Sequence, residues 1–167
     1  VALNRAIREV TGIPCGIKWP NDILCNGRKL VGILTEMSAE MDAINHIVIG
    51  MGINVNIAAE EIPPELREIA TSIQIEKGAP VSRLDLLVRI LECLEELYLA
   101  VRTGGFDAVL SAWRQESITL GRLVNVIAPD KSYQGTALDI DGDGALLVET
   151  AQGLERVLAG DVSIRPA

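Results

Sequence analysis

Apolar residues recur at helical spacing in three stretches of this chain, and each stretch predicts an amphipathic helix. The three stretches cover residues 1–10, 82–102 and 106–116. In the first stretch, Leu3, Ile7 and Val10 already form an apolar stripe, so we expect the chain to begin inside a helix and to be a fragment of a longer protein. The stripe of the second stretch is expected to pack in the core, and it consists of Leu84, Leu87, Leu91, Leu94 and Tyr98.

Between the first two helices the apolar residues form short runs, which are typical of β-strands. Strands are predicted over residues 15–19, 29–37 and 44–55, with a turn over 38–42. Residues 47–49 are three consecutive apolar residues, whereas a strand that is wetted on one side alternates. We therefore expect helices to cover at least part of that face. Residues 58–80 are less regular, and a short helix is predicted near 65–70.

After Ser117 the helical periodicity disappears, and short apolar runs alternate with turn-forming residues. These runs cover residues 120–128, 132–140, 145–150, 154–158 and 162–164. Such regular punctuation predicts a small antiparallel β-barrel. We therefore expect an α+β fold with two domains, a sheet with flanking helices over residues 1–117 and the barrel over residues 118–167.

The composition excludes several classes of function. The net charge is −8, which argues against a nucleic-acid surface because such a surface needs clustered basic residues. No apolar run approaches the length of a membrane span and no signal peptide is apparent, so a cytoplasmic protein is expected. Cys15, Cys25 and Cys93 are widely spaced, and we expect them to be buried free thiols. The single histidine, His46, is expected to be structural.

The candidate chemistry is concentrated in residues 18–34. Asn26-Gly27 lies between two apolar runs, which is the strongest short signal for a β-hairpin. Turn chemistry does not explain Lys18 and Lys29 at the strand ends. It does not explain Gly32 inside a strand either, where glycine usually marks a bulge or a close approach by backbone or ligand. The stretch is therefore either a well-made turn or an anion-binding site.

A second glycine-rich run, Gly-Met-Gly-Ile-Asn-Val-Asn, covers residues 50–56. A dinucleotide-binding turn would need a third glycine and a helix directly after it, and neither follows. Alternate glycines instead leave one strand face without side chains, suited either to a flat ring or phosphate or to close packing of a helix. The acidic run over residues 139–144 has Thr150 where a calcium loop places its bidentate Glu, so it predicts a polar turn.

Three of these runs, in this order and at this spacing, resemble the downstream signature blocks of the biotin protein ligases. The blocks are Lys18-Trp-Pro-Asn-Asp22, Lys29-Leu-Val-Gly-Ile-Leu34 and Gly50-Met-Gly-Ile-Asn54-Val-Asn56. The tail resembles the small SH3-like C-terminal domain of the same family. The resemblance implies a truncated class II synthetase-like catalytic domain, with a mixed sheet and flanking helices, followed by an SH3-like barrel. It also implies the family activity, in which biotin is activated with ATP to biotinyl-adenylate and transferred to a lysine of a biotin carboxyl carrier protein.

The resemblance implies catalytic roles for two lysines. Lys29 would lie beside the biotin carboxylate and the α-phosphate of ATP, and Lys18 would sit toward the phosphates, where the transition state gathers negative charge. Asn21 and Asp22 would face the pyrophosphate and its Mg²⁺, with Asp22 as the metal ligand.

The same resemblance implies the binding residues. Backbone groups of Gly32 and Leu34 would contact biotin. Gly50, Ile53 and Asn54 would hold the adenylate, with the Asn54 side chain at the adenine edge.

Two motifs of the family do not occur in these 167 residues. These are the Gly-Arg-Gly-Arg type loop that closes over biotin and the phosphates, and the Ser/Thr that binds the ureido ring. Both would lie upstream of Val1, as would the DNA-binding winged helix that some members carry, so we expect this chain alone to bind the adenylate weakly.

Two other interpretations stay open. One is a non-catalytic binding or dimerisation module, such as a homodimer that pairs through exposed sheet edges, and Lys18 and Lys29 on opposite faces of the sheet would favour it. The other is a relative of the lipoate ligases, which would share the adenylate chemistry.

Overall fold

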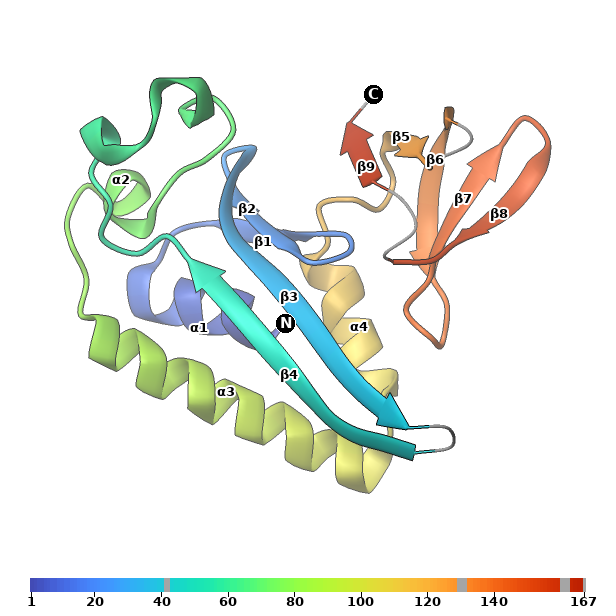
Figure 1. Cartoon of the computed structure of the whole chain (residues 1–167), viewed down its shortest axis with the longest axis horizontal. Helices are drawn as coiled ribbons and strands as arrows, with labels where there is room; N and C mark the ends of the chain where they lie inside the picture. The colour runs from blue at the N-terminus through green and yellow to red at the C-terminus, as the bar shows by residue number, and fades with distance from the viewer. Residues whose placement is uncertain (41–42, 129–131, 160–162, 167) are drawn as a thin grey trace.

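The computed structural model describes residues 1–40, 43–128, 132–159 and 163–166 of the chain. Its strands form two antiparallel sheets, which are accompanied by α-helices, so the predicted α+β class is confirmed (Figure 1). The first sheet has the order β1-β2-β3-β4, with bounds Cys15–Lys18, Asp22–Cys25, Arg28–Glu40 and Ala43–Ile53. The second has the order β8-β7-β6-β5-β9, with β5 Leu123–Ile127, β6 Ser132–Ile140, β7 Leu146–Thr150, β8 Gly153–Val157 and β9 Ser163–Pro166.

The three long helices lie where the apolar spacing predicts them. The α-helices are α1 Ala2–Thr11, α2 Ile73–Lys77, α3 Arg83–Gly104 and α4 Asp107–Glu116. The helix predicted near residues 65–70 is wrong, because only a 3-10 turn over Pro64–Leu66 forms there, after another over Ala59–Glu61. The α-helix of this region is α2, which begins after Ser72, whose hydroxyl accepts the Ile75 N–H at 3.1 Å, and ends at left-handed Gly78.

The first sheet is built around one long hairpin of β3 and β4 (Figure 1). The turn predicted over residues 38–42 is wrong for residues 38–40, which continue β3 in register with β4, and residues 41–42 lie outside the described residues. The expected mixed pairing is not observed either. The described strands pair antiparallel, and the parallel contacts are single bridges between Ile17 and Ser117 and between Lys29 and Ala70.

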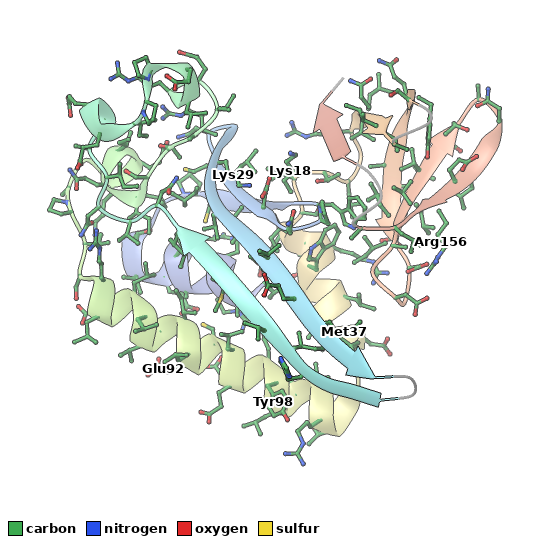
Figure 2. All side chains as sticks on the ribbon, viewed as in Figure 1. Lys18, Lys29, Met37, Glu92, Tyr98 and Arg156 are labelled. Atoms are coloured by element: carbon green, nitrogen blue, oxygen red, sulfur yellow. The ribbon has the colours of Figure 1, made fainter. Side chains whose placement is uncertain are left out.

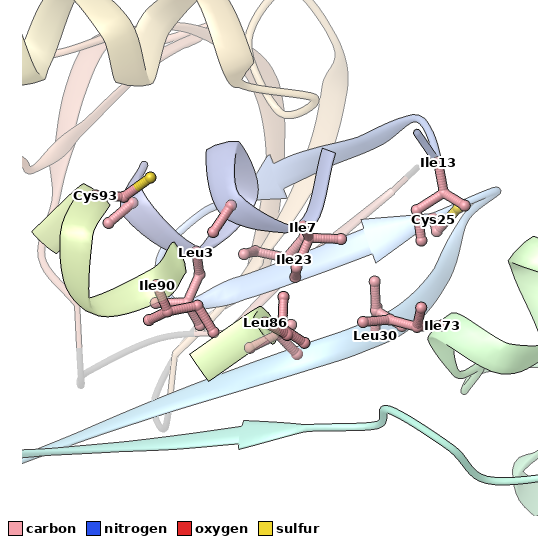
Figure 3. Close-up of a cluster of buried hydrophobic side chains, with 13 residues drawn as sticks. Leu3, Ile7, Ile13, Ile23, Cys25, Leu30, Ile73, Leu86, Ile90 and Cys93 are labelled. Atoms are coloured by element: carbon pink, nitrogen blue, oxygen red, sulfur yellow. The ribbon is translucent and has the colours of Figure 1, made fainter. Parts of the chain in front are cut away.

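One face of the first sheet is covered by α1 and α3, and the main core lies in between (Figure 3). Ile7 of α1, Leu30 of β3 and Leu86 of α3 are all at most 2% exposed. Burial of one such aliphatic side chain contributes about 1.5–3 kcal/mol. The apolar packing that stabilises the sheet therefore lies on its helix-covered face, and the opposite face takes no part in this core.

Two expectations about burial are wrong. Of the predicted core stripe of α3, Leu84, Leu87, Leu91 and Tyr98 are exposed and only Leu94 is half-buried. The buried side of α3 is instead its other apolar stripe, formed by Leu86, Ile90 and Cys93, because that stripe faces α1 and the sheet. Residues 47–49 of β4 are each more than half exposed, so no described helix covers them.

The second sheet has a core of its own, which includes Trp19 from the first part of the chain and against which Leu110 and Trp113 of α4 also pack. Trp19 is 3% exposed and packs with the buried apolar side chains of β5, β6, β7 and β8. The strands agree with the apolar runs of the tail to within a few residues. The domain boundary near residue 118 stays a prediction.

The three cysteines are free thiols, as expected. Cys25 and Cys93 are buried, but Cys15 is only half-buried because it lies on β1 at the edge of the sheet, so the expectation of three buried thiols is wrong for Cys15. His46, expected to be structural, is exposed on β4. In the part of the chain that the structure describes, no helix is long and apolar enough to cross a membrane.

Candidate active site

One row of residues crosses all four strands of the first sheet. Lys18 of β1 is the register partner of Asp22 of β2, Asp22 is the partner of Gly32 of β3, and Gly32 is the partner of Gly52 of β4. Directly opposite residues share a face of a sheet. The next row is Ile17, Ile23, Val31 and Ile53, and its members Ile23, Val31 and Ile53 pack in or against the main core on the helix-covered side. The row from Lys18 to Gly52 therefore lies on the sheet face away from the main core.

Both predicted catalytic lysines meet one carboxylate in this row. The Lys29 Nζ lies 2.6 Å from Asp22 Oδ1, and the Lys18 Nζ lies 3.9 Å from Asp22 Oδ2. Figure 2 labels the two lysines on the ribbon. The Asp22 and Lys18 side chains are each 16% exposed, whereas half of the Lys29 side chain is exposed. The lysines are not splayed onto opposite faces, which was the arrangement that would have favoured a plain binding module.

A β-bulge turns Lys29 toward this face. The β2–β3 register shifts after Ile23–Val31, so that Leu24 pairs with Lys29 and β3 carries one extra residue. Leu30 and Val31 consequently both point into the core, at 0% and 1% exposure, and Lys29 points the other way. Bulges characteristically re-aim a side chain in this manner.

Gly32 leaves the space in which the Lys29 side chain lies. A Cβ at Gly32 would be 3.0 Å from Lys29 Cε, 3.1 Å from its Nζ and 3.8 Å from Asp22 Oδ1. The sequence predicted either a bulge or a close approach at Gly32. The structure has a bulge beside it and a close approach at it, by the lysine amine.

The backbone of Lys29 is fixed on both sides by the segment before α2. Its N–H donates to the Ile69 carbonyl at 2.8 Å, and its carbonyl accepts the Thr71 N–H at 2.9 Å. These bonds tie the start of β3 to a segment some forty residues further along the chain. The position of the lysine is therefore set before any substrate arrives.

Glu76 of α2 secures the same region, although no sequence pattern singles it out as a site residue. Its carboxylate accepts hydrogen bonds from Thr71 Oγ1 at 2.6 Å, Asn26 Nδ2 at 2.6 Å and Arg28 Nη2 at 2.7 Å. Burial alone would raise the pKa of Glu76, but the hydrogen bonds from Thr71, Asn26 and Cys25 together with the charge of Arg28 lower it. No local pattern links Asn26 to Glu76, although Ser72 and Gly78 are cap signals that would have located α2.

Two predicted site residues use their amide groups to hold backbone. Asn21 Nδ2 donates to the Ile33 carbonyl at 2.7 Å, and the Ile33 N–H donates back to the Asn21 carbonyl at 2.9 Å. Asn54 Nδ2 donates to the Thr71 carbonyl at 2.9 Å. Both asparagines therefore contribute to the geometry around the lysines.

The glycines of β4 border an open strand face. Gly50 is the register partner of Leu34, which is 62% exposed, and a Cβ at Gly50 would meet only Leu34, at 3.7 Å. A Cβ at Gly52 would meet only the Gly32 carbonyl, also at 3.7 Å. Among the described residues, no helix packs over these glycines. The Ile53 side chain does not join this face, because it packs against the main core.

A resident metal site is not apparent in the described ranges. They contain no group of three or more His, Cys, Asp or Glu side chains that could hold a metal ion. The acidic run between β6 and β7 forms the polar turn that its sequence predicts. In this turn Asp141 Oδ1 accepts the N–H groups of Asp143 and Ala145, and both acidic side chains pair with Arg156 (Figure 2).

Two family profiles match this chain, and together they define its class of protein. The profile of the biotin/lipoate A/B protein ligase family matches residues 1–54, and that of the biotin protein ligase C-terminal domain matches residues 119–165. The chain is 40% identical over 164 residues to the bifunctional ligase/repressor BirA of Bacillus subtilis, covering 98% of this chain and 50% of that protein. It is 35% identical over 148 residues to the biotin--[acetyl-CoA-carboxylase] ligase of Mycobacterium tuberculosis, covering 88% and 52%.

Solved structures agree with these matches. The apo biotin protein ligase of Aquifex aeolicus superposes with a TM-score of 0.89 at 27% identity, covering 99% of this chain and 72% of that one. The complex of the same ligase with biotin and ATP gives 0.85 at 27% identity, covering 99% and 68%. The chain belongs to the biotin protein ligase family. It spans about half the length of the curated relatives it matches.

Proposed function

We propose that the protein carrying this chain is an ATP-dependent biotin protein ligase, which converts biotin to biotinyl-adenylate and then biotinylates a lysine of a carrier protein. The observation that carries this proposal is the meeting of Lys18 and Lys29 on Asp22, beside a strand face lined by glycines. It is supported by the names of the relatives and by the biotin and ATP bound to the Aquifex aeolicus ligase.

The first step brings two anions together, so it requires positioned cations. A biotin carboxylate oxygen attacks the α-phosphorus of ATP, the bond to the β-phosphate oxygen breaks, and pyrophosphate leaves. Lys29, half exposed at the open face, stabilises the negative charge on the reacting carboxylate and α-phosphate. Lys18 stabilises the negative charge on the leaving pyrophosphate. In the second step the carrier lysine amine attacks the acyl carbon of biotinyl-adenylate and AMP leaves.

The binding residues of this proposal surround the row. Backbone groups of Gly32 and Leu34 contact biotin on the open face. The adenylate lies along Gly50, with a backbone contribution from Ile53 and the Asn54 amide at the adenine edge. Asn54 Nδ2 is already used by the Thr71 carbonyl, and its Oδ1 has no hydrogen-bond partner among the described residues, which leaves an acceptor for an adenine amino group.

Magnesium belongs to this proposal as a companion of ATP. Mg²⁺ in nucleotide sites usually keeps water and takes one or two carboxylates besides the phosphates. Asp22 fits that pattern as the single carboxylate of the row, with Asn21 next to it. An ion bound there would be held by Asp22 and would neutralise phosphate charge, and the amines of Lys18 and Lys29 would face the substrate anions.

The wider assignments follow from the activity. The acceptor is the biotin carboxyl carrier protein of a biotin-dependent carboxylase, and a cytoplasmic location is part of the proposal. Homodimer formation stays a prediction.

Biotin-dependent exchange of pyrophosphate into ATP tests the proposal. This chain is compared with an extended protein, in which it is preceded by the segment that carries the Gly/Arg-rich loop. We expect exchange in the extended protein and little or none in this chain alone. Exchange in neither would contradict the ligase activity and favour a binding module, and exchange with lipoate in place of biotin would favour a lipoate-ligase relative.

A further inference from the structure

The residue next to Lys18 is buried in the second sheet. Trp19 packs among Val124, Val126 and Val148, and its indole Nε1 donates to the Gly144 carbonyl at 3.1 Å. A buried indole N–H needs such a partner, because leaving it unsatisfied costs free energy. The signature block that begins at Lys18 is therefore anchored outside its own sheet.

The segment that joins α4 to β5 holds the chain on both sides of Lys18. The Ile118 N–H donates to the Ile17 carbonyl at 2.9 Å, and the Trp19 N–H donates to Thr119 Oγ1 at 2.9 Å. Thr119 is 4% exposed, so this hydroxyl is a buried and specific acceptor. The backbone that aims Lys18 is thus fixed immediately before and immediately after it.

The turn that receives the indole is itself braced. The Gly144 N–H donates to the Asp141 carbonyl, and Asp141 Oδ1 accepts the Ala145 N–H, both at 3.0 Å. Arg156 of β8 pairs with the other oxygen of Asp141. Asp141 and Arg156 therefore brace the turn whose Gly144 carbonyl accepts the hydrogen bond of the Trp19 indole.

We propose that Thr119 and Trp19 are positioning residues for adenylation, through which the C-terminal sheet fixes Lys18 and Asp22 at the phosphates of ATP. Neither side chain belongs to the row that faces the substrates, and both act through Lys18. This inference rests on the proposed function of the same site. It gives the C-terminal sheet a contribution to catalysis that requires no substrate contact of its own.

The Thr119→Val variant of the extended protein tests this inference, because valine keeps the shape of threonine and removes the acceptor. We expect kcat for biotin-dependent pyrophosphate exchange to fall between about 5-fold and about 100-fold, the scale of a misplaced catalytic group. Thr119→Ser, which keeps the hydroxyl, should restore the rate. Thr150→Val is the matched control, since Thr150 Oγ1 donates to the Gly153 carbonyl in a turn of the same sheet and should leave kcat unchanged.

The effect of Thr119→Val on the rate in a Lys18→Ala background distinguishes a positioning role of Thr119 from a purely structural one. If Thr119 acts through Lys18, Thr119→Val should have little further effect in a Lys18→Ala background. Effects that multiply in the double variant would overturn the inference, as would an unchanged rate in Thr119→Val.

Amide hydrogen exchange on this chain separates the inference from the proposed function. In Thr119→Val, exchange over residues 17–22 should accelerate at least about tenfold, while the amides of β7 stay protected. Unchanged protection over residues 17–22 would overturn the inference even in an active ligase. Absence of pyrophosphate exchange in the extended wild-type protein would instead overturn the proposed function, and the amide measurement would still decide the positioning role.

Discussion

Lys29 Nζ lies 2.6 Å from Asp22 Oδ1, and the two residues reach each other from different strands because a bulge and a glycine make room. The bulge turns Lys29 away from the core side of β3, and Gly32 leaves space beneath its side chain. Asp22 holds the amine in place while the substrates are absent. The pair is half exposed on the lysine side, so its value lies in geometry more than in stability.

Replacing Lys29 tests its role most directly. In the extended protein, Lys29→Ala should lower kcat for biotin-dependent pyrophosphate exchange by roughly 100-fold, or about 3 kcal/mol, the scale of one lost transition-state charge contact. Thermal unfolding should change little, because the ion pair is partly exposed. An unchanged exchange rate would remove Lys29 from the reaction.

Gly32→Ala should separate the position of the lysine from its presence. The new Cβ would lie 3.0 Å from Lys29 Cε, the far end of a flexible side chain, so the amine should move away from Asp22 without unfolding the sheet. We expect a loss of exchange activity of about tenfold or more, because a displacement near 1 Å is costly in catalysis. Gly104→Ala is the control, since a Cβ there meets nothing within 4 Å, and it should keep full activity. Equal rates in the two variants would contradict the steric argument.

Local sequence signals predicted the parts of the site that depend on neighbouring residues. Asn26 and Gly27 do adopt positive φ, 49° and 77°, as the hairpin turn requires. Lys18 and Lys29 stand out in the sequence because turn chemistry does not explain them. Gly32 indicates that a bulge lies nearby, but it does not indicate that Lys29 is the residue that the bulge turns.

Long-range packing accounts for what the sequence could not predict. Helix α3 has two apolar stripes, and periodicity alone does not tell which one faces a partner. The insertion of Trp19 into the core of the second sheet joins residues more than a hundred positions apart. The link between Asn26 and Glu76 spans fifty positions and has no repeat or motif to reveal it.

Glu76 should be a main support of the hairpin at neutral pH. Its folded pKa is lowered, so its contribution is present above the ordinary value of 4.5 and is lost as the pH falls below it. Glu76→Ala should reduce the free energy of unfolding at pH 7 by about 2–4 kcal/mol, because it strips a buried carboxylate from three donors.

Urea unfolding between pH 3 and pH 7 checks this prediction. The difference in stability between the wild type and Glu76→Ala should shrink toward acid pH. Glu65→Ala is a suitable control, since Glu65 is exposed and has no described hydrogen bond or ion pair. A difference that stays constant with pH would contradict the assignment.

The thiols opposite each other on β1 and β2 should make the chain sensitive to alkaline pH. Burial raises the pKa of Cys15 to about 11 and, together with Glu76, that of Cys25 to about 12, from an ordinary value of 9.0. Above pH 9 the unfolded chain therefore loses these protons while the folded chain keeps them. By linkage, stability should fall as the pH rises from about 9 toward 11.

Denaturant unfolding between pH 8 and pH 11 should show a shallower decline for a Cys15→Ala/Cys25→Ala variant than for the wild type. Val148→Ala, which opens a comparable cavity without removing a titratable group, should keep the wild-type slope, and a matching slope in the double-cysteine variant would rule the thiols out as the cause.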